Sequence, residues 1–202
     1  MPSPNYVRLL VRSWRTMIVG AFVGAALASV FSMVQPLRYS STERVLITQT
    51  NTAGVDPYTA IKSTERIAQN LSAIIYTTSF FNAVMAKAKV DPAYFPTDEY
   101  DKRATWTKTI ETSIEGGTGV MTIVAYHPKR DEATELAVRV AEQIRDIAPT
   151  YFGYSVRVQI IDDPLPSRFI AKPDFMKNAS FGAILGCLLG VAWVFGKVKQ
   201  VG

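Results

Sequence analysis

The sequence contains only one cysteine, Cys187, and only one histidine, His127. A single cysteine excludes a disulfide within the chain, so any folded domain must be held together by its apolar core. Metal sites built on nitrogen and sulfur need clustered histidine and cysteine ligands, and this composition excludes such a cluster. A lone histidine at the end of a strand is most often structural, and we interpret His127 in this way.

Sequence motifs for catalysis are also lacking. Neither a G-x-x-x-x-G-K-[ST] phosphate-binding loop nor a G-x-S-x-G nucleophile motif occurs. Asp162 and Asp163 are adjacent carboxylates, but acids directly before a proline more often mark the end of a strand than an acid–base pair. We therefore expect no catalytic residue, no metal and no cofactor, and we expect that the protein is not an enzyme.

Charge is absent from two long stretches, residues 17–34 (MIVGAFVGAALASVFSMV) and residues 178–196 (NASFGAILGCLLGVAWVFG). At about 1.5 Å per helical residue, each stretch nearly matches a hydrocarbon core roughly 30 Å thick. The sequence therefore predicts transmembrane helices over residues 17–35 and 178–196.

The two chain ends, residues 1–16 and 197–202, contain no acidic residue, and their basic residues are Arg8, Arg12, Arg15, Lys197 and Lys199. Residues 36–177 carry 17 basic and 17 acidic residues and are neutral. Because basic flanks mark the cytoplasmic side, we expect an inner-membrane protein with cytoplasmic ends at 1–16 and 197–202 and a domain outside. The sequence pI of about 9.3 then reflects topology, and no nucleic-acid partner is expected.

A cleavable signal peptide is an alternative for the first span. Ala26 and Ala28 fit a small-x-small cleavage site, which would remove residues 1–28 and leave one span. Against this, the apolar run continues to Val34 and the basic leader is long. The same outside domain follows in either case.

Residues 36–163 show the patterns of a small folded domain. Alternating apolar residues predict strands over 42–50, 119–127 and 155–162, the last nearer an edge. Residues 51–54 are expected to form a loop.

Helical spacing of apolar residues predicts three helices in the same domain. The first, over 58–88, is capped by Asp56 and has a weak point at 77–79. The second begins at Thr97 and is stopped by glycines at 116–117, and the third is capped by Asp131.

The order of these elements predicts an α/β (α+β) extracytoplasmic domain with a small mixed sheet, flanked by the two transmembrane helices. The last strand–helix–strand unit fits a parallel right-handed crossover. The first strand leaves the membrane and the last returns to it, so we expect these two to run antiparallel.

Glycines recur at four-residue spacing in both predicted spans. Gly182, Gly186 and Gly190 share one face of the second span, and Gly20 and Gly24 share a face of the first. Helix backbones approach closely at such rows, so we predict helix–helix packing there. The partner helix is left open: the other span, a neighbouring subunit or a different membrane protein.

Prolines mark residues 164–177, directly before the second span. Pro164, Pro166 and Pro173 fix φ and remove backbone donors, which predicts a stiff, extended segment. Two interpretations stand equally: a plain connector, or a rigid link that passes the orientation of the domain to the helix.

This layout resembles the polysaccharide chain-length determinants, the Wzz-type polysaccharide co-polymerases. Residues 38–47 resemble the family's Y-x-S/A-x-x-x-L-x-V first strand, and residues 68–79 resemble its A-x-x-L…S helix. Residues 128–137 resemble the P-x-x-A-x-x-x-A start of its last domain helix. Residues 164–174 resemble its P-x-x-P-S-x-P motif, although the proline spacing here is irregular and the domain is short.

The resemblance implies a non-enzymatic regulator of chain length in capsule, exopolysaccharide or O-antigen biosynthesis. It implies a homo-oligomeric ring in the inner membrane that contacts a membrane polysaccharide polymerase, with glycan or lipid-linked glycan as a further candidate partner. A neutral outside domain is compatible with lateral packing of like domains. Two alternatives remain: an adaptor for a separate cytoplasmic tyrosine kinase, against which the short tail counts, and an extracytoplasmic sensor module.

Overall fold

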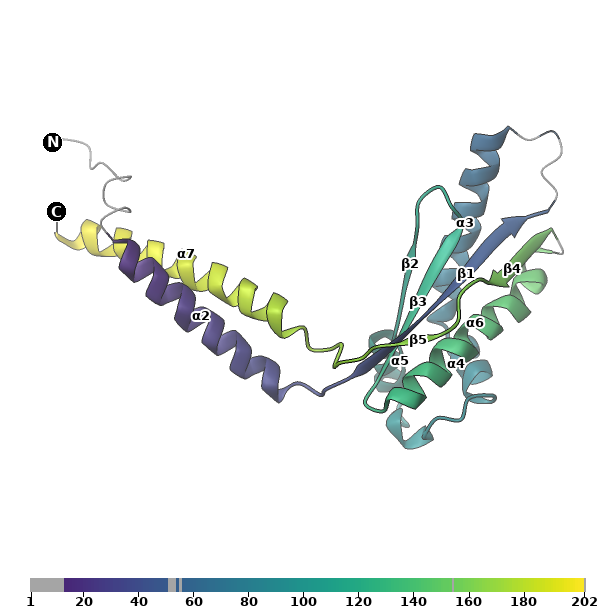
Figure 1. Cartoon of the computed structure of the whole chain (residues 1–202), viewed down its shortest axis with the longest axis horizontal. Helices are drawn as coiled ribbons and strands as arrows, with labels where there is room; N and C mark the ends of the chain where they lie inside the picture. Colours follow the sequence, from purple (N-terminus) through teal and green to yellow (C-terminus); the bar gives the residue numbers. More distant parts are fainter. Residues whose placement is uncertain (1–12, 51–53, 55, 154, 202) are drawn as a thin grey trace. The chain divides into compact units, whose positions relative to one another are not determined.

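The computed structural model describes residues 13–50, 54, 56–153 and 155–201, and side chains up to residue 196 (Figure 1). The chain divides into two compact units. The helix unit comprises residues 1–37 and 172–202, and the sheet domain comprises Arg38–Ala171. The predicted boundary between residues 163 and 164 lies inside the sheet domain, because residues 164–171 pack with it.

The helix unit contains α2, Trp14–Val34, and α7, Phe175–Val201. Both are long and apolar enough to cross a membrane, over Trp14–Val34 and Phe175–Gly196. Most of their large apolar side chains are exposed, which distinguishes them from the core helices of a soluble protein. Each helix begins three residues before the predicted span, because the helix continues into the polar flank.

The sheet has the strand order β2-β3-β1-β4, and β5 pairs with β1 beside β4. Every pairing among the described strands is antiparallel. The strands are β1 Tyr39–Gln49, β2 Ile110–Ile114, β3 Val120–His127, β4 Val156–Ile160 and β5 Leu165–Pro166. The three predicted strands are confirmed, as are the antiparallel first and last strands and the edge position of β4.

The predicted mixed sheet is wrong. Strands β3 and β4 do run in the same direction, but β1 lies between them and pairs antiparallel with both. The helix that connects them, α6, therefore crosses over β1 instead of joining neighbours. Periodicity reports which face of a strand is buried and carries no information about which strand is its neighbour.

The helices of the sheet domain are α3 Pro57–Ile75, α4 Thr78–Met85, the 3-10 turn η1 Pro92–Tyr94, α5 Glu99–Thr109 and α6 Arg130–Phe152. The predicted cap of the first helix is confirmed, since the Asp56 carboxylate accepts the N–H groups of Tyr58 and Thr59 at 3.0 Å each. The helix predicted over 58–88 is two helices, broken at the predicted weak point. There the Thr77 hydroxyl accepts the N–H of Phe80 at 3.3 Å and caps α4.

The second predicted helix ends early, which is a further correction. It stops at Thr109, and Ile110–Ile114 forms β2. Gly117, with φ of 78°, lies in the turn that joins β2 to β3 and does not terminate a helix. The third helix begins at Arg130 with Lys129 at its N-cap, so Asp131 lies in its first turn and is not the cap.

One face of the sheet is covered by helices, and the core lies there. Alternate residues of β1 and β3 are buried against α3 and α6, including Ile47, Ile123, Leu71 and Val140. Trp106 of α5 is fully packed in this core, and its indole N–H donates to the Ile75 carbonyl at 2.8 Å. Residues at the intervening strand positions are half-buried or exposed, so the sheet domain has two layers.

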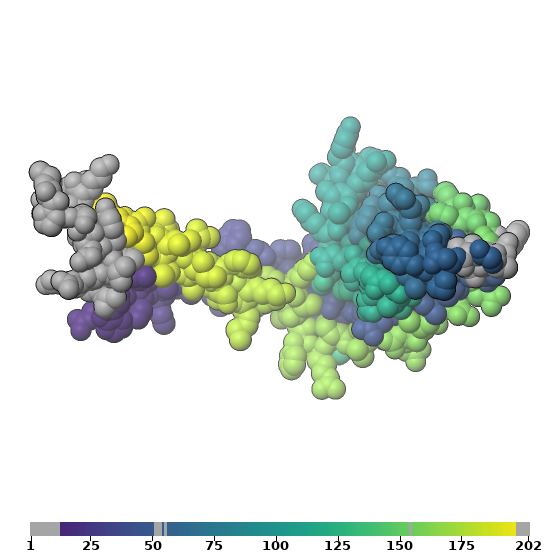
Figure 2. All heavy atoms as spheres, turned by 90° about the horizontal axis from the view of Figure 1, so that it is seen from above, coloured from purple at the N-terminus to yellow at the C-terminus, as the bar shows by residue number. Residues whose placement is uncertain are grey.

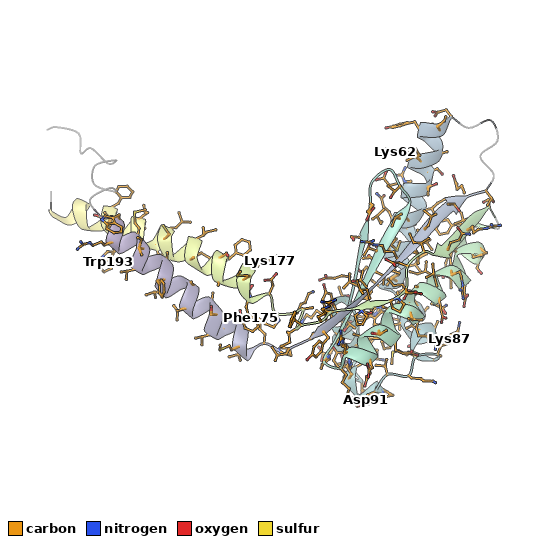
Figure 3. The ribbon with its side chains drawn as sticks, viewed as in Figure 1. Lys62, Lys87, Asp91, Phe175, Lys177 and Trp193 are labelled. Carbon is orange, nitrogen blue, oxygen red and sulfur yellow. The ribbon has the colours of Figure 1, made fainter. Side chains whose placement is uncertain are left out.

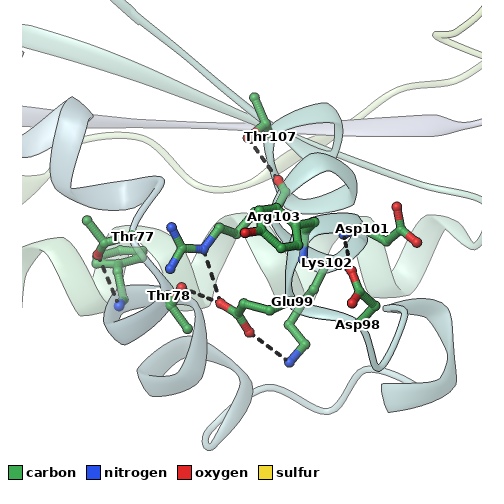
Figure 4. A network of polar contacts seen from close by, with 10 residues as sticks. Thr77, Thr78, Asp98, Glu99, Asp101, Lys102, Arg103 and Thr107 are labelled. Carbon is green, nitrogen blue, oxygen red and sulfur yellow. Dashed lines mark hydrogen bonds and ion pairs between the residues drawn. The ribbon is translucent and has the colours of Figure 1, made fainter.

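Glu99 joins α5 to the start of α4 (Figure 4). Its carboxylate accepts the Thr78 hydroxyl at 2.6 Å and the guanidinium N–H of Arg103 at 3.1 Å, and Lys102 lies 3.3 Å away. These donors, with the Thr78 hydroxyl foremost, lower the pKa of Glu99 to about 2. The network holds the two short helices that cover the aromatic part of the core.

Candidate functional site

The predicted glycine rows meet each other within the helix unit. Figure 2 shows α2 (purple) and α7 (yellow) side by side. Gly20 faces Gly186, and Gly24 faces Gly182, so α2 and α7 pack antiparallel along their small residues. A β-carbon at Gly20 would lie 2.5 Å from the Gly186 carbonyl oxygen, and one at Gly24 would approach the Gly182 carbonyl even more closely. Of the three partners left open by the sequence, the other span of the same chain occupies these faces.

A polar pair lies beside the glycine contact. The Asn178 side-chain amide donates to the Ser32 hydroxyl at 2.8 Å, and that hydroxyl donates to the Ala28 carbonyl at 2.9 Å. Ser32 is fully buried in the helix pair. A hydrogen bond between two apolar helices favours one register of their packing, because in any other register the amide would lie unpaired in an apolar medium.

Aromatic residues lie near the chain-terminal ends of the two helices. Trp14 begins α2, with the guanidinium of Arg15 5.9 Å from its ring centroid, and Trp193 lies in the last part of α7 (Figure 3). Tryptophan and arginine at one end of a helix pair are typical of a membrane–water boundary. Arg8 and Arg12 lie outside the described residues, and of Lys197 and Lys199 only the backbone, within α7, is described.

The proline segment lies along the edge of β1 and is not a free tether. Pro166 pairs with Ser41 and Leu165 with Thr42 in the β1–β5 ladder. Pro164 directly precedes this short strand, whereas Pro173 is part of the helix unit and is preceded by a cis Lys172-Pro173 bond. The first strand after α2 and the last strand before α7 are thus hydrogen-bonded to each other.

The edge that runs from β4 to Ala171 carries two bulges. Ile161 donates to the Arg44 carbonyl at 3.0 Å and Leu165 pairs with Thr42, so four steps on the edge match two on β1. The surplus falls at Asp162 and Asp163, and Asp162 lies 3.8 Å from the Arg44 guanidinium. The sequence interpretation of this acidic pair as a strand exit agrees with this geometry.

Glu43 is a buried carboxylate that sequence reasoning missed. It faces the core from β1, is 2% exposed, and one of its oxygens has no hydrogen-bond partner among the described residues. Burial is the main cause that raises the pKa of Glu43 to about 7, and the nearby carboxylates of Glu142 and Asp163 add to the same shift. The strict alternation along β1 was the available signal, because it assigns Glu43 to the same face as Val45 and Ile47.

His127 is buried at the end of β3. Its Nδ1 accepts the Lys129 N–H at 3.2 Å, its Nε2 lies 3.5 Å from the Glu132 carboxylate, and the Tyr94 ring packs edge-on against it. Burial lowers the pKa of His127, opposed in part by Glu132. These contacts hold the turn between β3 and α6, which agrees with a structural role.

A surface cavity of about 210 Å³ lies at the C-terminal end of β1, near Gln49. It is lined by the turn between β2 and β3 and by the first turns of α3, with hydroxyl and amide groups from Thr48, Gln49, Thr64 and Thr118. The lining also includes the apolar side chains of Ile47, Ala60 and Ile61 and no charged residue, so it offers hydrogen bonds and apolar contacts to a neutral ligand. Among the described residues, no group of three or more histidine, cysteine, aspartate or glutamate side chains is arranged to hold a metal ion.

Comparison with known proteins adds no assignment to this geometry: no family model matches the chain, and no curated protein matches it significantly.

Proposed function

We propose that this protein is a subunit of an oligomeric inner-membrane co-polymerase that sets the chain length of a bacterial polysaccharide. In this proposal α2 and α7 cross the membrane, both chain ends are cytoplasmic, and the sheet domain lies outside. The protein acts without catalysis, by contacting a membrane polysaccharide polymerase.

The observation that carries the proposal is the pairing of the first and last strands of one domain between two packed apolar helices. Ser40 follows the last residue of α2 by six residues, Ser167 precedes the first residue of α7 by eight, and the two serines are hydrogen-bonded to each other. A domain closed in this way couples to its membrane helices at a single edge. This suits a scaffold that orients a partner in the membrane.

The segments that resemble the chain-length determinants coincide with structural positions that such a scaffold needs. Residues 38–47 lie in or next to β1, Ala68 and Leu71 are buried core residues of α3, and residues 128–137 contain the start of α6. Residues 164–174 contain β5 and the approach to α7. The resemblance therefore falls on the elements that build the domain and connect it to the helices.

The outward faces of the helix pair are available for a membrane partner in this proposal. The glycine rows are used between α2 and α7, and large apolar side chains such as Phe22, Leu27 and Phe181 are exposed. Contacts with the polymerase or with neighbouring subunits then use these side chains rather than the glycines.

Deleting the gene in its native host tests the function directly. The length distribution of the surface polysaccharide, resolved on a gel, is expected to change, and the intact gene is expected to restore it. An unchanged length distribution, whether the amount of polymer stays the same or falls, contradicts the proposal.

A variant pair sharpens the same experiment. Gly24→Val places a side chain against the Gly182 carbonyl, whereas Gly196→Val adds a side chain where nothing lies within 4 Å. We expect only the Gly24 variant to shift the length distribution. Particle images of the detergent-purified protein test the oligomer separately, and a ring with defined symmetry is the expected result.

A further inference from the structure

Arg168, Phe169 and Ile170 form the second bulge on the edge of the sheet domain, here called the RFI bulge. On one side the Ser167 N–H donates to the Ser40 carbonyl at 2.7 Å, and on the other the Ala171 N–H donates to the Arg38 carbonyl at 2.8 Å. The edge advances four residues between these bonds while β1 advances two. The two extra residues of the edge therefore bulge out of the ladder between Ser167 and Ala171.

The RFI bulge exposes apolar surface. Phe169 is 81% exposed and Ile170 is also exposed, whereas the core of the same domain buries Phe80, Phe81 and Phe95. Leu165, four residues earlier on this edge, is exposed as well. A single exposed apolar side chain is ordinary, but three within six residues of one edge indicate a surface that another phase or molecule covers.

Chain length limits how far this surface lies from the apolar helices. Ile170 precedes the first residue of α7, Phe175, by five residues, and Arg38 follows the last residue of α2, Val34, by four. An extended chain covers at most about 3.5 Å per residue, so the two tethers are shorter than roughly 18 Å and 14 Å. The hydrogen bond between Arg38 and Ala171 joins both tethers to the bulge.

The composition of the bulge suits a lipid interface. Phenylalanine and large aliphatic side chains insert at the boundary between headgroups and acyl chains, and arginine places its guanidinium beside phosphate while its stem covers apolar surface. Arg168 is exposed and makes no ion pair or hydrogen bond within the described part of the chain. An unpaired guanidinium next to an exposed phenylalanine complements the anionic phosphates and the acyl boundary beneath them.

We propose that the RFI bulge inserts into the phospholipid headgroup region of the membrane that α2 and α7 cross, with Phe169 and Ile170 toward the acyl chains and Arg168 at the phosphates. This inference rests on the membrane placement in the proposed function but not on a role in polysaccharide synthesis. The bulge gives the domain a third contact with the bilayer beside its two covalent tethers, and so restricts its tilt.

Site-specific fluorescence in vesicles tests the insertion. In full-length protein carrying Cys187→Ser, a single cysteine is introduced by Phe169→Cys or Ile170→Cys and labelled with a fluorophore. The protein is reconstituted into phosphatidylcholine–phosphatidylglycerol vesicles, and quenching by headgroup-labelled lipid is compared with quenching by aqueous iodide. The Ile170 label leaves Phe169 in place, so it reports on the intact anchor.

Two further positions serve as matched controls. Tyr58→Cys replaces an exposed aromatic residue at the opposite end of β1 from Arg38, and Phe22→Cys replaces an exposed residue of α2. We expect lipid quencher to remove most of the signal at 169 and 170 while iodide has little effect. The label at 58 is expected to show the reverse.

The outcomes separate the possible failures. Iodide quenching at 169 and 170 equal to that at 58 overturns the insertion, and so does protection from both quenchers, which would indicate contact with another protein or another copy. Iodide access at 22 overturns the membrane placement itself. Unchanged polysaccharide length on gene deletion contradicts only the co-polymerase function and leaves the insertion standing.

Substitutions within the bulge add a test of mechanism. With the label at 170, Phe169→Ser is expected to reduce lipid quenching, and Arg168→Gln is expected to reduce it in vesicles that contain phosphatidylglycerol. Tyr58→Ser is expected to leave it unchanged. Equal quenching in all of these proteins overturns the roles assigned to Phe169 and Arg168.

Discussion

Ser40 and Ser167 exchange two hydrogen bonds across the edge of the sheet, although 127 residues separate them. The Ser167 N–H donates to the Ser40 carbonyl at 2.7 Å, and the Ser40 N–H donates to the Ser167 hydroxyl at 3.0 Å. This pair closes the sheet domain at the point where the chain enters and leaves it. The first strand of the domain and the segment that leads out of it are therefore held in a fixed orientation to each other.

Ser167→Ala is expected to loosen this closure. The substitution removes the acceptor for the Ser40 N–H but keeps the backbone bond, so we expect a loss of about 0.5–1.5 kcal/mol in the free energy of unfolding. Hydrogen exchange of the Ser40 amide in the detergent-purified protein should become faster. Ser113→Ala, at an exposed position of β2, is the control and should leave that exchange unchanged.

Gly24→Val is expected to separate α2 from α7. The valine side chain overlaps the Gly182 backbone, and overpacking of this kind costs about 1–3 kcal/mol. The Tm in detergent should fall, and Cys187 of α7 should react faster with a maleimide. Gly196→Val, which meets no atom within 4 Å, should match the wild type in both measurements, and equal behaviour of the two variants would contradict the packing.

Glu43→Gln is expected to change how stability depends on pH. Because the folded-state pKa of Glu43 is about 7, above its ordinary value of 4.5, the folded protein holds a proton that the unfolded chain releases. The wild type should therefore lose stability as pH rises from about 4.5 to 7, by up to roughly 3 kcal/mol. A glutamine keeps the neutral shape and should remove this slope.

Thermal unfolding at pH 5 and pH 8 measures that difference. The gain in Tm from Glu43→Gln should be larger at pH 8 than at pH 5. Glu115→Gln, at an exposed position after β2, controls for the loss of one negative charge. A parallel shift of both variants would show that burial of Glu43 is not the cause.

Glu99→Gln is expected to act at the opposite end of the pH range. Its folded-state pKa of about 2 lies below the ordinary 4.5, so its stabilising effect is present above pH 4.5 and is lost as pH falls toward 2. The variant should be less stable than the wild type at pH 7, and the difference should shrink in acid. Acid unfolding followed by Trp106 fluorescence measures this difference in stability. Both proteins carry Trp14→Phe and Trp193→Phe, so that Trp106 is the only tryptophan that emits.

Local patterns in the sequence were sufficient for several features. The two apolar helices follow from uncharged runs, and the cap at Asp56 and the break at residues 77–79 follow from capping and helix propensities that act over a few residues. The strand faces at Val45 and Ile47 follow from alternation. Each of these signals depends on residues that are neighbours in the chain.

The local signal was ambiguous for β2. Ile110 and Ile114 are four residues apart, which fits a helix face, and together with Thr112 they also fit one face of a strand. The pairing of Ile110 with Ala125 and Ile114 with Met121 decides the matter in favour of the strand. That pairing becomes available only when the turn at Gly117 brings β3 back along β2.

Tertiary structure alone decided the antiparallel sheet, the position of the proline segment on β1 and the mutual contact of the glycine rows. All three depend on which distant segments become neighbours. The sequence by itself determined that two apolar helices flank a small α+β domain along the chain, because apolar runs and periodicity are properties of consecutive residues. The neighbours of those elements are set by hydrogen bonds and close packing between segments far apart in the chain, such as Ser40 with Ser167 and Gly24 with Gly182.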